Sequence, residues 1–395
     1  MKIHNLEFKN YYLYLLLIYS FWIISLLLYF FLSEYVKAGA LINGVKFGTD
    51  TVYYLEQANN IIKGDYIFDN KSKFGYLLFL IPFLYFKIPL IFIVMFQFLL
   101  TAISACCLYK ITEKIFCKLS GVICVGLFLL YFPIQIRNFY ILTEMLFIDI
   151  VIILSYFFVY FKKKYIPLII FLIIALISIR PNGILFLFSI IISLFFLLIK
   201  YKKYSYLIIY LIFSLILSFP IIEMLNNNVK DWDIIHHLSN KGIIYGWSFI
   251  ENGRCRIECR GVEFINENYQ NNLFGIFSFY YANFYELLKI FFLKVFWLLI
   301  RARPYYSDLH NFYTLLFSII IYSGFIYGFI KRPKGIFSIN IILFFILLSI
   351  CSVGLTFVDW SGRFSLYFLP LIMIFSSYGL LIFLKKVFKL YFNLK

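Results

Sequence analysis

The sequence predicts an all-α polytopic membrane protein, and three observations support this fold class. Of the 395 residues, 63% are hydrophobic and only 14% are charged, whereas a soluble domain carries about 25% charged residues. Long, continuous apolar runs recur over the whole chain, and each of the longer ones can cross hydrocarbon as a helix. Lysines cluster in the short segments between these runs, as they do in the loops of membrane proteins.

The apolar runs set the order of the expected helices. They cover residues 11–32, 76–86, 90–109, 119–136, 141–161, 165–179, 183–199, 205–224, 286–300, 311–330, 336–356 and 364–384. The first run is too long for the core of a signal peptide, so we expect a retained span. The run 76–86 makes only about 17 Å of helix, whereas hydrocarbon needs about 30 Å. The run 286–300 contains lysines and ends at an Arg-Ala-Arg-Pro sequence, which is typical of a helix lying at the interface.

The basic loops decide the expected topology. They are 110–118, 162–164, 200–203, 331–334 and the tail after residue 385, and the positive-inside rule places all of them in the cytoplasm. These loops lie on the same side of the membrane only if the segment 76–109 crosses the membrane once and the segment 286–300 does not cross it. The result is about ten spans in the plasma (inner) membrane, with both termini cytoplasmic. The net charge of +17 is then explained by the basic cytoplasmic loops, so no nucleic-acid partner is expected.

The outer loops defined by this topology are 33–75, 137–140, 180–182, 225–310 and 357–363. Residues 1–395 are predicted to form a single integral-membrane domain, with a partly ordered cap at 225–285. Within that cap, Cys255 and Cys259 are able to form a disulfide if the loop faces an oxidising compartment. A zinc site there is disfavoured, because no further ligands lie at the required spacing.

Six charged residues fall at the outer face: Asp50, Lys73, Arg137, Glu144, Arg180 and Arg363. The lysine clusters alone set the topology, so this convergence is separate support for a site at that face. A general base needs a reachable, shielded carboxylate, which Asp50 can supply, although Asp50 is also suited to cap the amphipathic helix that follows it. Lys73 can hold a lipid phosphate as a point charge, or it can anchor the chain at the interface.

The remaining charges also have two interpretations each. Glu144 begins an apolar run, where the helix dipole favours it, yet a charge at the edge of hydrocarbon is often functional. Arg180 lies on the side that should be poor in basic residues, and a guanidinium binds phosphate in bidentate fashion. Arg363 is again on the outer side, where Asp359 offers a local partner. His236 and His237 are expected to be solvated.

The pattern resembles the GT-C superfamily of polytopic glycosyltransferases, which use polyprenyl-phosphate sugars. It is most similar to the protein O-mannosyltransferase and lipid A aminoarabinose transferase type. The matching segments are Asp50-Thr51-Val52-Tyr53 with Gly64, Lys73-Phe74-Gly75-Tyr76, Pro133 with Leu142-Thr143-Glu144, Arg180-Pro181-Asn182-Gly183, and Gly362-Arg363-Phe364 with Pro370. Each segment is weakly specific alone, but their order and sidedness agree over most of the chain.

The resemblance implies roles for two acids and two tyrosines. Asp50 would be the catalytic base, and Glu144 the second outer-loop acid that helps to place the sugar or the acceptor. Tyr53 and Tyr76 belong to the matching motifs and would position substrate. Many relatives carry two adjacent acids at the first motif, whereas Thr51 follows Asp50 here. A divalent metal is therefore possible but not indicated, and no other cofactor is expected.

The resemblance also implies which cations would bind the donor phosphate. Lys73 and Arg363 are the leading candidates, followed by Arg180 and Arg137. The expected reaction transfers a sugar from a polyprenyl-phosphate donor, with inversion, to a lipid-linked glycan, lipid or protein acceptor. It would take place at the extracytoplasmic face, among membrane lipids.

Two other functions remain open. An O-antigen-type glycan polymerase would share the spans and the outer arginines, but it would not need the motif that begins at Asp50. A lipid or glycan transporter would place ionisable groups near the middle of the membrane and would contain broken helices. Neither the sugar nor the acceptor can be named from these residues.

Overall fold

Most helices in the structure follow the apolar runs of the sequence. The computed structural model describes residues 12–24, 26–27, 41–42, 45–46, 49–65, 73–203, 205–206, 241–248, 253–259, 261–265, 269, 272–304, 306–333, 336–356, 359–360 and 362–392. Nearly all of the run 205–224, and with it His236 and His237, lies outside these residues. The same is true of much of the first outer loop.

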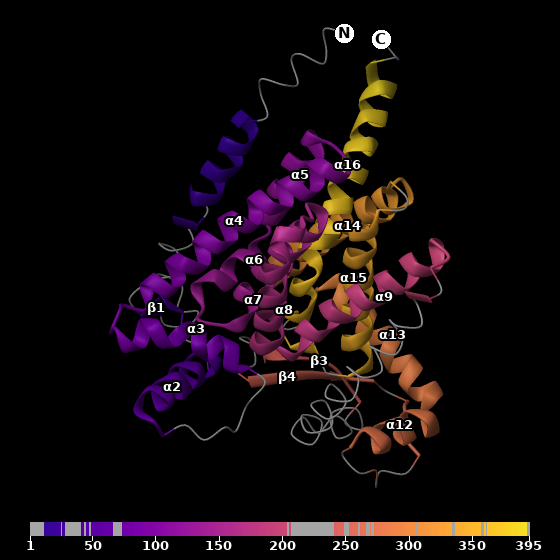
Figure 1. Ribbon diagram of the computed structural model, residues 1–395. Helices are drawn as coiled ribbons and strands as arrows, with labels where there is room; N and C mark the ends of the chain where they lie inside the picture. The colour runs from indigo at the N-terminus through magenta and orange to yellow at the C-terminus, as the bar shows by residue number, and fades with distance from the viewer. Residues whose placement is uncertain are drawn as a thin grey trace. The chain divides into compact units, whose positions relative to one another are not determined.

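The labelled helices are shown in Figure 1. They are α2 (Thr49–Lys63), α3 (Phe74–Tyr85), α4 (Ile91–Ile115), α5 (Lys118–Leu130), α6 (Phe132–Gln135), α7 (Thr143–Val159), α8 (Ile166–Ile179), α9 (Ile184–Lys200), α12 (Leu273–Ala282), α13 (Phe284–Ile300), α14 (Asp308–Ile330), α15 (Phe337–Leu355) and α16 (Leu369–Phe392). Short 3-10 turns include η2 (Ile136–Phe139), η4 (Pro181–Gly183) and η5 (Phe364–Tyr367). An unlabelled helix covers Tyr12–Ile24.

Five helices in the described part are long and apolar enough to cross a membrane. They are Ile91–Ile115, Pro181–Lys200, Asp308–Ile330, Phe337–Leu355 and Leu369–Val387. The segment Lys118–Leu130 with Phe132–Phe139 would be a sixth, but it bends by 57°. α7 and α8 are shorter, with 17 and 14 residues, or about 25 and 21 Å. These findings support a membrane protein, while the count of ten spans and the orientation stay predictions.

The bend after α5 has a local cause in the sequence. Tyr131 has an extended backbone, with φ −79° and ψ 91°. Pro133 follows in the first turn of α6. Proline is favoured in the first turn of a helix, where its missing N–H has no helical partner to lose, and is disfavoured in the interior. The chain therefore stops one helix and starts another inside an apolar stretch.

The chain forms two compact units, each assembled from separate parts of the sequence. The first comprises residues 1–186, 320–338 and 367–395, and the second comprises 187–319 and 339–366. In the first unit α7 is the central helix. α7 packs on α4 and on α8. α5 packs on α4 and on α16, and α3 packs on α2 and on α8. α7 is apolar nearly all round, so burial on several sides is what its composition favours.

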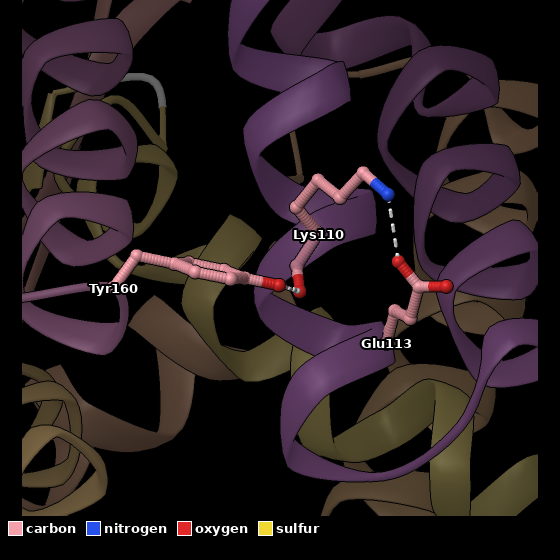
Figure 2. A network of polar contacts seen from close by, with 3 residues as sticks. All are labelled: Lys110, Glu113 and Tyr160. Carbon is pink, nitrogen blue, oxygen red and sulfur yellow. Dashed lines mark hydrogen bonds and ion pairs between the residues drawn. The ribbon is translucent and has the colours of Figure 1, made fainter.

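Polar contacts join the C-terminal ends of α4 and α7 (Figure 2). Tyr160 Oη donates a hydrogen bond to the backbone oxygen of Lys110 at 3.1 Å, and the Lys110 amine lies 2.9 Å from Glu113 Oε2. Lys114 Nζ donates to the carbonyl of Val159 at 2.8 Å, where the helix dipole favours a cation. The contacts bring the basic loops 110–118 and 162–164 to one edge of the unit, as a shared side of the membrane requires.

Short strands occur in both large outer loops, so the all-α prediction was incomplete. β1 (Leu41–Ile42) and β2 (Val45–Lys46) form a small hairpin. In the second unit β3 (Gly242–Ser248) pairs antiparallel with β4 (Gly253–Glu258) and parallel with β5 (Asp359–Trp360).

A small hydrophobic core anchors this sheet to α13. It contains Ile243, Ile244, Val262 and Ile290, together with Cys259. The β-branched residues of β3 favour an extended backbone once one face is buried. Cys259 is buried, and the side chain of Cys255 lies outside the described residues, so the disulfide considered above stays a prediction.

Gly75 sets the distance between α3 and α8 and gives a first prediction. A Cβ atom at this position would lie 2.8 Å from Ser178 Cβ and 3.0 Å from the Ser178 carbonyl carbon. We expect Gly75→Ala to lower the free energy of unfolding by about 1–3 kcal/mol, because the helices would have to separate. Gly126→Ala is the control, since the nearest atom to its new Cβ is Ile18 Cδ1 at 3.6 Å. Thermal unfolding in detergent should separate the two variants, and equal melting temperatures would contradict the prediction.

Candidate active site

A buried ion pair lies at the centre of the candidate site. Arg180 Nη1 lies 3.2 Å from Glu144 Oε1, and the two side chains are only 15% and 2% exposed. The same nitrogen donates a hydrogen bond to Thr143 Oγ1 at 2.7 Å. The Arg180 guanidinium also lies over the ring of Tyr367, with 4.8 Å between Cζ and the ring centroid. Paired and stacked in this way, the arginine is held in one orientation.

The turn that presents Arg180 is fixed by its neighbours. Arg180 has an extended backbone, with φ −150° and ψ 139°, which is the conformation that a following proline favours. Pro181 then begins η4. At Gly183 a Cβ atom would lie 2.5 Å from the Leu176 carbonyl oxygen, so only glycine allows the chain to pass so close to α8. The sequence Arg-Pro-Asn-Gly thus builds the position of the guanidinium.

Asp50 enters the site from the start of α2. It lies in the first turn of that helix and is half-buried, so it is inside the helix and not at the capping position that precedes it. The same helix buries Thr51, Tyr54 and Ala58 at a spacing of three and four residues, which puts them on one face. α2 rests on α3 through this face.

Lys73 and three tyrosines complete the cluster. The Lys73 amine lies 5.2 Å from the centroid of the Tyr54 ring. Tyr54 in turn meets Tyr76 edge to face, with centroids 5.2 Å apart, and Tyr53 at 5.8 Å. Tyr76 is fully buried, and its hydroxyl has no hydrogen-bond partner among the described residues.

The charges act on one another across this cluster. Burial lowers the pKa of the Lys73 amine, and the positive charge of Arg180 acts in the same direction. The carboxylates of Asp50 and Glu144, and Tyr53, oppose that shift. Burial also raises the pKa of the Tyr54 phenol, and the Glu144 carboxylate adds to the effect. The structure therefore brings two acids and two cations into one region of the first unit.

A second prediction follows from the lowered pKa of Lys73. Binding of a phosphate group beside Lys73 should weaken as the pH rises, because Lys73 loses its proton below the ordinary lysine value of about 10.4. The affinity for polyprenyl phosphate, measured against pH, reports this step. Lys73→Arg is the matched variant, because guanidinium stays charged throughout. An unchanged pH step in Lys73→Arg would show that another group titrates.

The contacts given above do not include two predicted site residues, Arg137 and Arg363. Arg137 lies in η2 of the first unit, and none of the contacts given above involves it. Arg363 belongs to the second unit, directly before η5, and is half-buried. The side chain of Asp359 lies outside the described residues, so the pair that it offers to Arg363 stays a prediction.

Arg301 holds the loop around Arg363, and the sequence did not predict this role. It is 5% exposed and has a left-handed backbone with φ 60°. Its Nη1 donates to the Gly362 carbonyl at 2.9 Å and also bonds Ser365 Oγ. Gly362 itself has φ 69°, a conformation that glycine adopts at little cost. The sequence Arg-Ala-Arg-Pro indicated an interfacial helix end and carried no signal for this contact.

Three further residues around the ion pair were not predicted from the sequence: Thr143, Tyr54 and Tyr367. The one available signal was the position of Thr143 immediately before Glu144.

Among the described residues, no group of three or more His, Cys, Asp or Glu side chains could hold a metal ion. In comparisons with known proteins, no protein-family model, curated protein or solved structure matches the chain.

Proposed function

We propose that this protein is a membrane glycosyltransferase that uses a polyprenyl-phosphate sugar as donor. The observation that supports this most strongly is the cluster of Asp50, Lys73, Glu144 and Arg180. These residues are far apart in the sequence, yet they act electrostatically on one another in the structure. A phosphate needs cations, and an acceptor hydroxyl needs a base, and both kinds of group occur here together.

The proposed reaction is an inverting displacement. Lys73 and Arg180 hold the donor phosphate. The two polar contacts of Arg180 described above both use Nη1, which is one of three guanidinium nitrogens that together carry five N–H donors. Asp50 takes the proton from the acceptor hydroxyl as the oxygen attacks the anomeric carbon. The new bond joins the acceptor oxygen to that carbon, and the bond to the phosphate oxygen breaks. Polyprenyl phosphate leaves as the anion, stabilised by the two cations.

Glu144 has a positioning role in this scheme. Its carboxylate fixes the guanidinium of Arg180 and sets which nitrogens face the donor. The sugar and the acceptor are not specified by any contact in the described residues. Tyr53 and Tyr76 are proposed to shape the pocket around them, while the phosphate-binding role of Arg363 stays a prediction from the sequence.

The experiment uses membranes that contain the full chain and a panel of labelled polyprenyl-phosphate sugars, with cell extract as the source of acceptor. Release of free polyprenyl phosphate and transfer of label are followed together. Turnover of one donor would support the proposal and identify the sugar. The absence of turnover with every donor would contradict it.

A second candidate, lipid or glycan transport, is favoured by one specific observation. Asp149 is fully buried within α7, close to the bent segment formed by α5, α6 and η2. Buried ionisable groups beside broken helices are common in transporters. Donor movement across vesicles without release of polyprenyl phosphate would favour transport over transfer.

A further inference from the structure

A second polar cluster lies inside the first unit, away from the contacts of the candidate active site. Its side chains are Thr101 and Ser104 of α4, Asn138 of η2 and Asp149 of α7, and each is fully buried. α4 and α7 are otherwise largely apolar, so these groups have been taken out of water at considerable cost. A buried charge in such surroundings calls for a partner.

The cluster contains more oxygen acceptors than protons. Thr101 Oγ1 lies 3.0 Å from Asn138 Oδ1 and 3.4 Å from Asp149 Oδ2. A hydroxyl has one proton, so Thr101 can donate to only one of these two oxygens. Asn138 Nδ2 donates elsewhere, to Gln135 Oε1 at 3.5 Å. At least one pair of oxygens is therefore in contact without a proton between them.

The other side of the Asp149 carboxylate is also short of donors. By strict geometry Asp149 Oδ1 and Ser104 Oγ form no hydrogen bond with any described residue, although the Ser104 hydroxyl is near enough to act on the carboxyl group as a donor. No lysine, arginine or histidine in the described part forms an ion pair with Asp149. A proton on Oδ2 would resolve the contact with Thr101, so a neutral carboxylic acid is the competing state that the experiment separates from a bound cation.

The apolar span that carries Asn138 is interrupted beside this cluster. η2 follows the break after α5, so Asn138 lies on an interrupted span. Gln97 of α4 holds this segment, since its Nε2 donates to the carbonyls of Asn138 and Tyr140 at 2.8 and 3.0 Å. Interrupted helices commonly line cation sites inside membranes. The oxygens of the cluster are thus held in place by the fold.

We propose that Asp149, Thr101, Ser104 and Asn138 bind a sodium ion. One monovalent cation neutralises the single carboxylate, whereas a divalent ion would leave an excess positive charge and would take six or more oxygens. The close spacing of the oxygens favours the smaller Na⁺ over K⁺. The ion would join α4, η2 and α7, and its binding does not depend on the proposed glycosyl transfer.

The test measures the thermal unfolding of the full chain in detergent against NaCl, with KCl and choline chloride keeping the ionic strength constant. A ligand that binds only the folded state raises the melting temperature as its concentration rises. We expect this rise with Na⁺ alone, together with saturable binding of ²²Na⁺. Equal curves in NaCl and choline chloride, without saturable ²²Na⁺ binding, would overturn the proposal.

Variants locate the site. Asp149→Asn should abolish the Na⁺ dependence, and Thr101→Val should weaken Na⁺ binding at least about tenfold, whereas Thr101→Ser keeps the hydroxyl and the response. Ser155→Ala is the matched control, because Ser155 is buried in the same helix and, within the part of the chain that the structure describes, its hydroxyl donates to the Val151 carbonyl and to no other group. If Asp149→Asn does not fold, the two Thr101 variants decide the question.

A proton is the competing occupant, and the same measurements exclude or establish it. A neutral carboxylic acid would leave the melting temperature independent of Na⁺ at every pH and dependent on pH in a way that Asp149→Asn removes. That result would overturn the sodium site. None of these measurements needs a sugar donor, so failure of the proposed enzyme and failure of the proposed ion site are distinguishable.

Discussion

Replacing Asp50 by asparagine is expected to reduce sugar transfer by about 10²–10⁴-fold, the usual contribution of a general base. Asparagine keeps the size and polarity of the side chain but cannot accept the acceptor proton. Because Asp50 is half-buried in the first turn of α2, the fold should survive the substitution. The measurement is kcat for label transfer with the donor identified by the panel.

Glu56→Gln is the matched control for this prediction. Glu56 lies in the same helix but is exposed to solvent, so removing its charge should leave kcat within about twofold, since surface changes have small effects. Full transfer by Asp50→Asn would remove the proposed base. Together with loss of activity on substitution of the arginines, that outcome would favour the glycan polymerase.

Replacing Arg180 by glutamine is expected to have the largest effect on stability. The change leaves Glu144 buried without its cation, and breaking a buried ion pair by removing one partner costs about 3–5 kcal/mol. It also removes the stacking on Tyr367 and one of the two proposed phosphate ligands. The melting temperature and the donor KM should therefore change together.

Two further variants separate the charge from the pairing. The double variant Glu144→Gln with Arg180→Gln removes both charges and should recover part of the lost stability, because no uncompensated charge remains. Lys110→Gln is the control, since Lys110 and Glu113 form an exposed pair, which is worth at most about 1 kcal/mol. A melting temperature of Arg180→Gln equal to that of Lys110→Gln would contradict the prediction.

The class of protein and the positions of its helices could be predicted from local sequence. Apolar runs require burial in lipid or protein whatever their neighbours are, so their bounds agree with α4, α9, α14 and α15 to within a few residues. The Arg-Pro-Asn-Gly turn was also readable, because Pro and Gly act on their own backbone, whereas the run 119–136 is continuous in the sequence and its bend before Pro133 was not predicted. Asp50, Lys73, Glu144 and Arg180 stood out because charge is rare in such a chain.

Contacts between distant segments could not be predicted in this way. The strands β3 and β5 come from two loops more than a hundred residues apart, so no local pattern in either loop indicates that they pair. The Arg301 contact with Gly362 and the buried oxygens around Asp149 are of the same kind. Each depends on which helices pack together, and no single segment contains that information.

The sequence by itself thus determined the membrane character, the helix order and the rare charges at the ends of spans, because the cost of placing each residue in hydrocarbon is local. Only the tertiary structure decided that Arg180 pairs with Glu144, that Lys73 lies against Tyr54, and that Asp149 meets Thr101. Hydrogen bonds and ion pairs act over a few ångströms, so they exist only after the packing of helices has brought remote residues together.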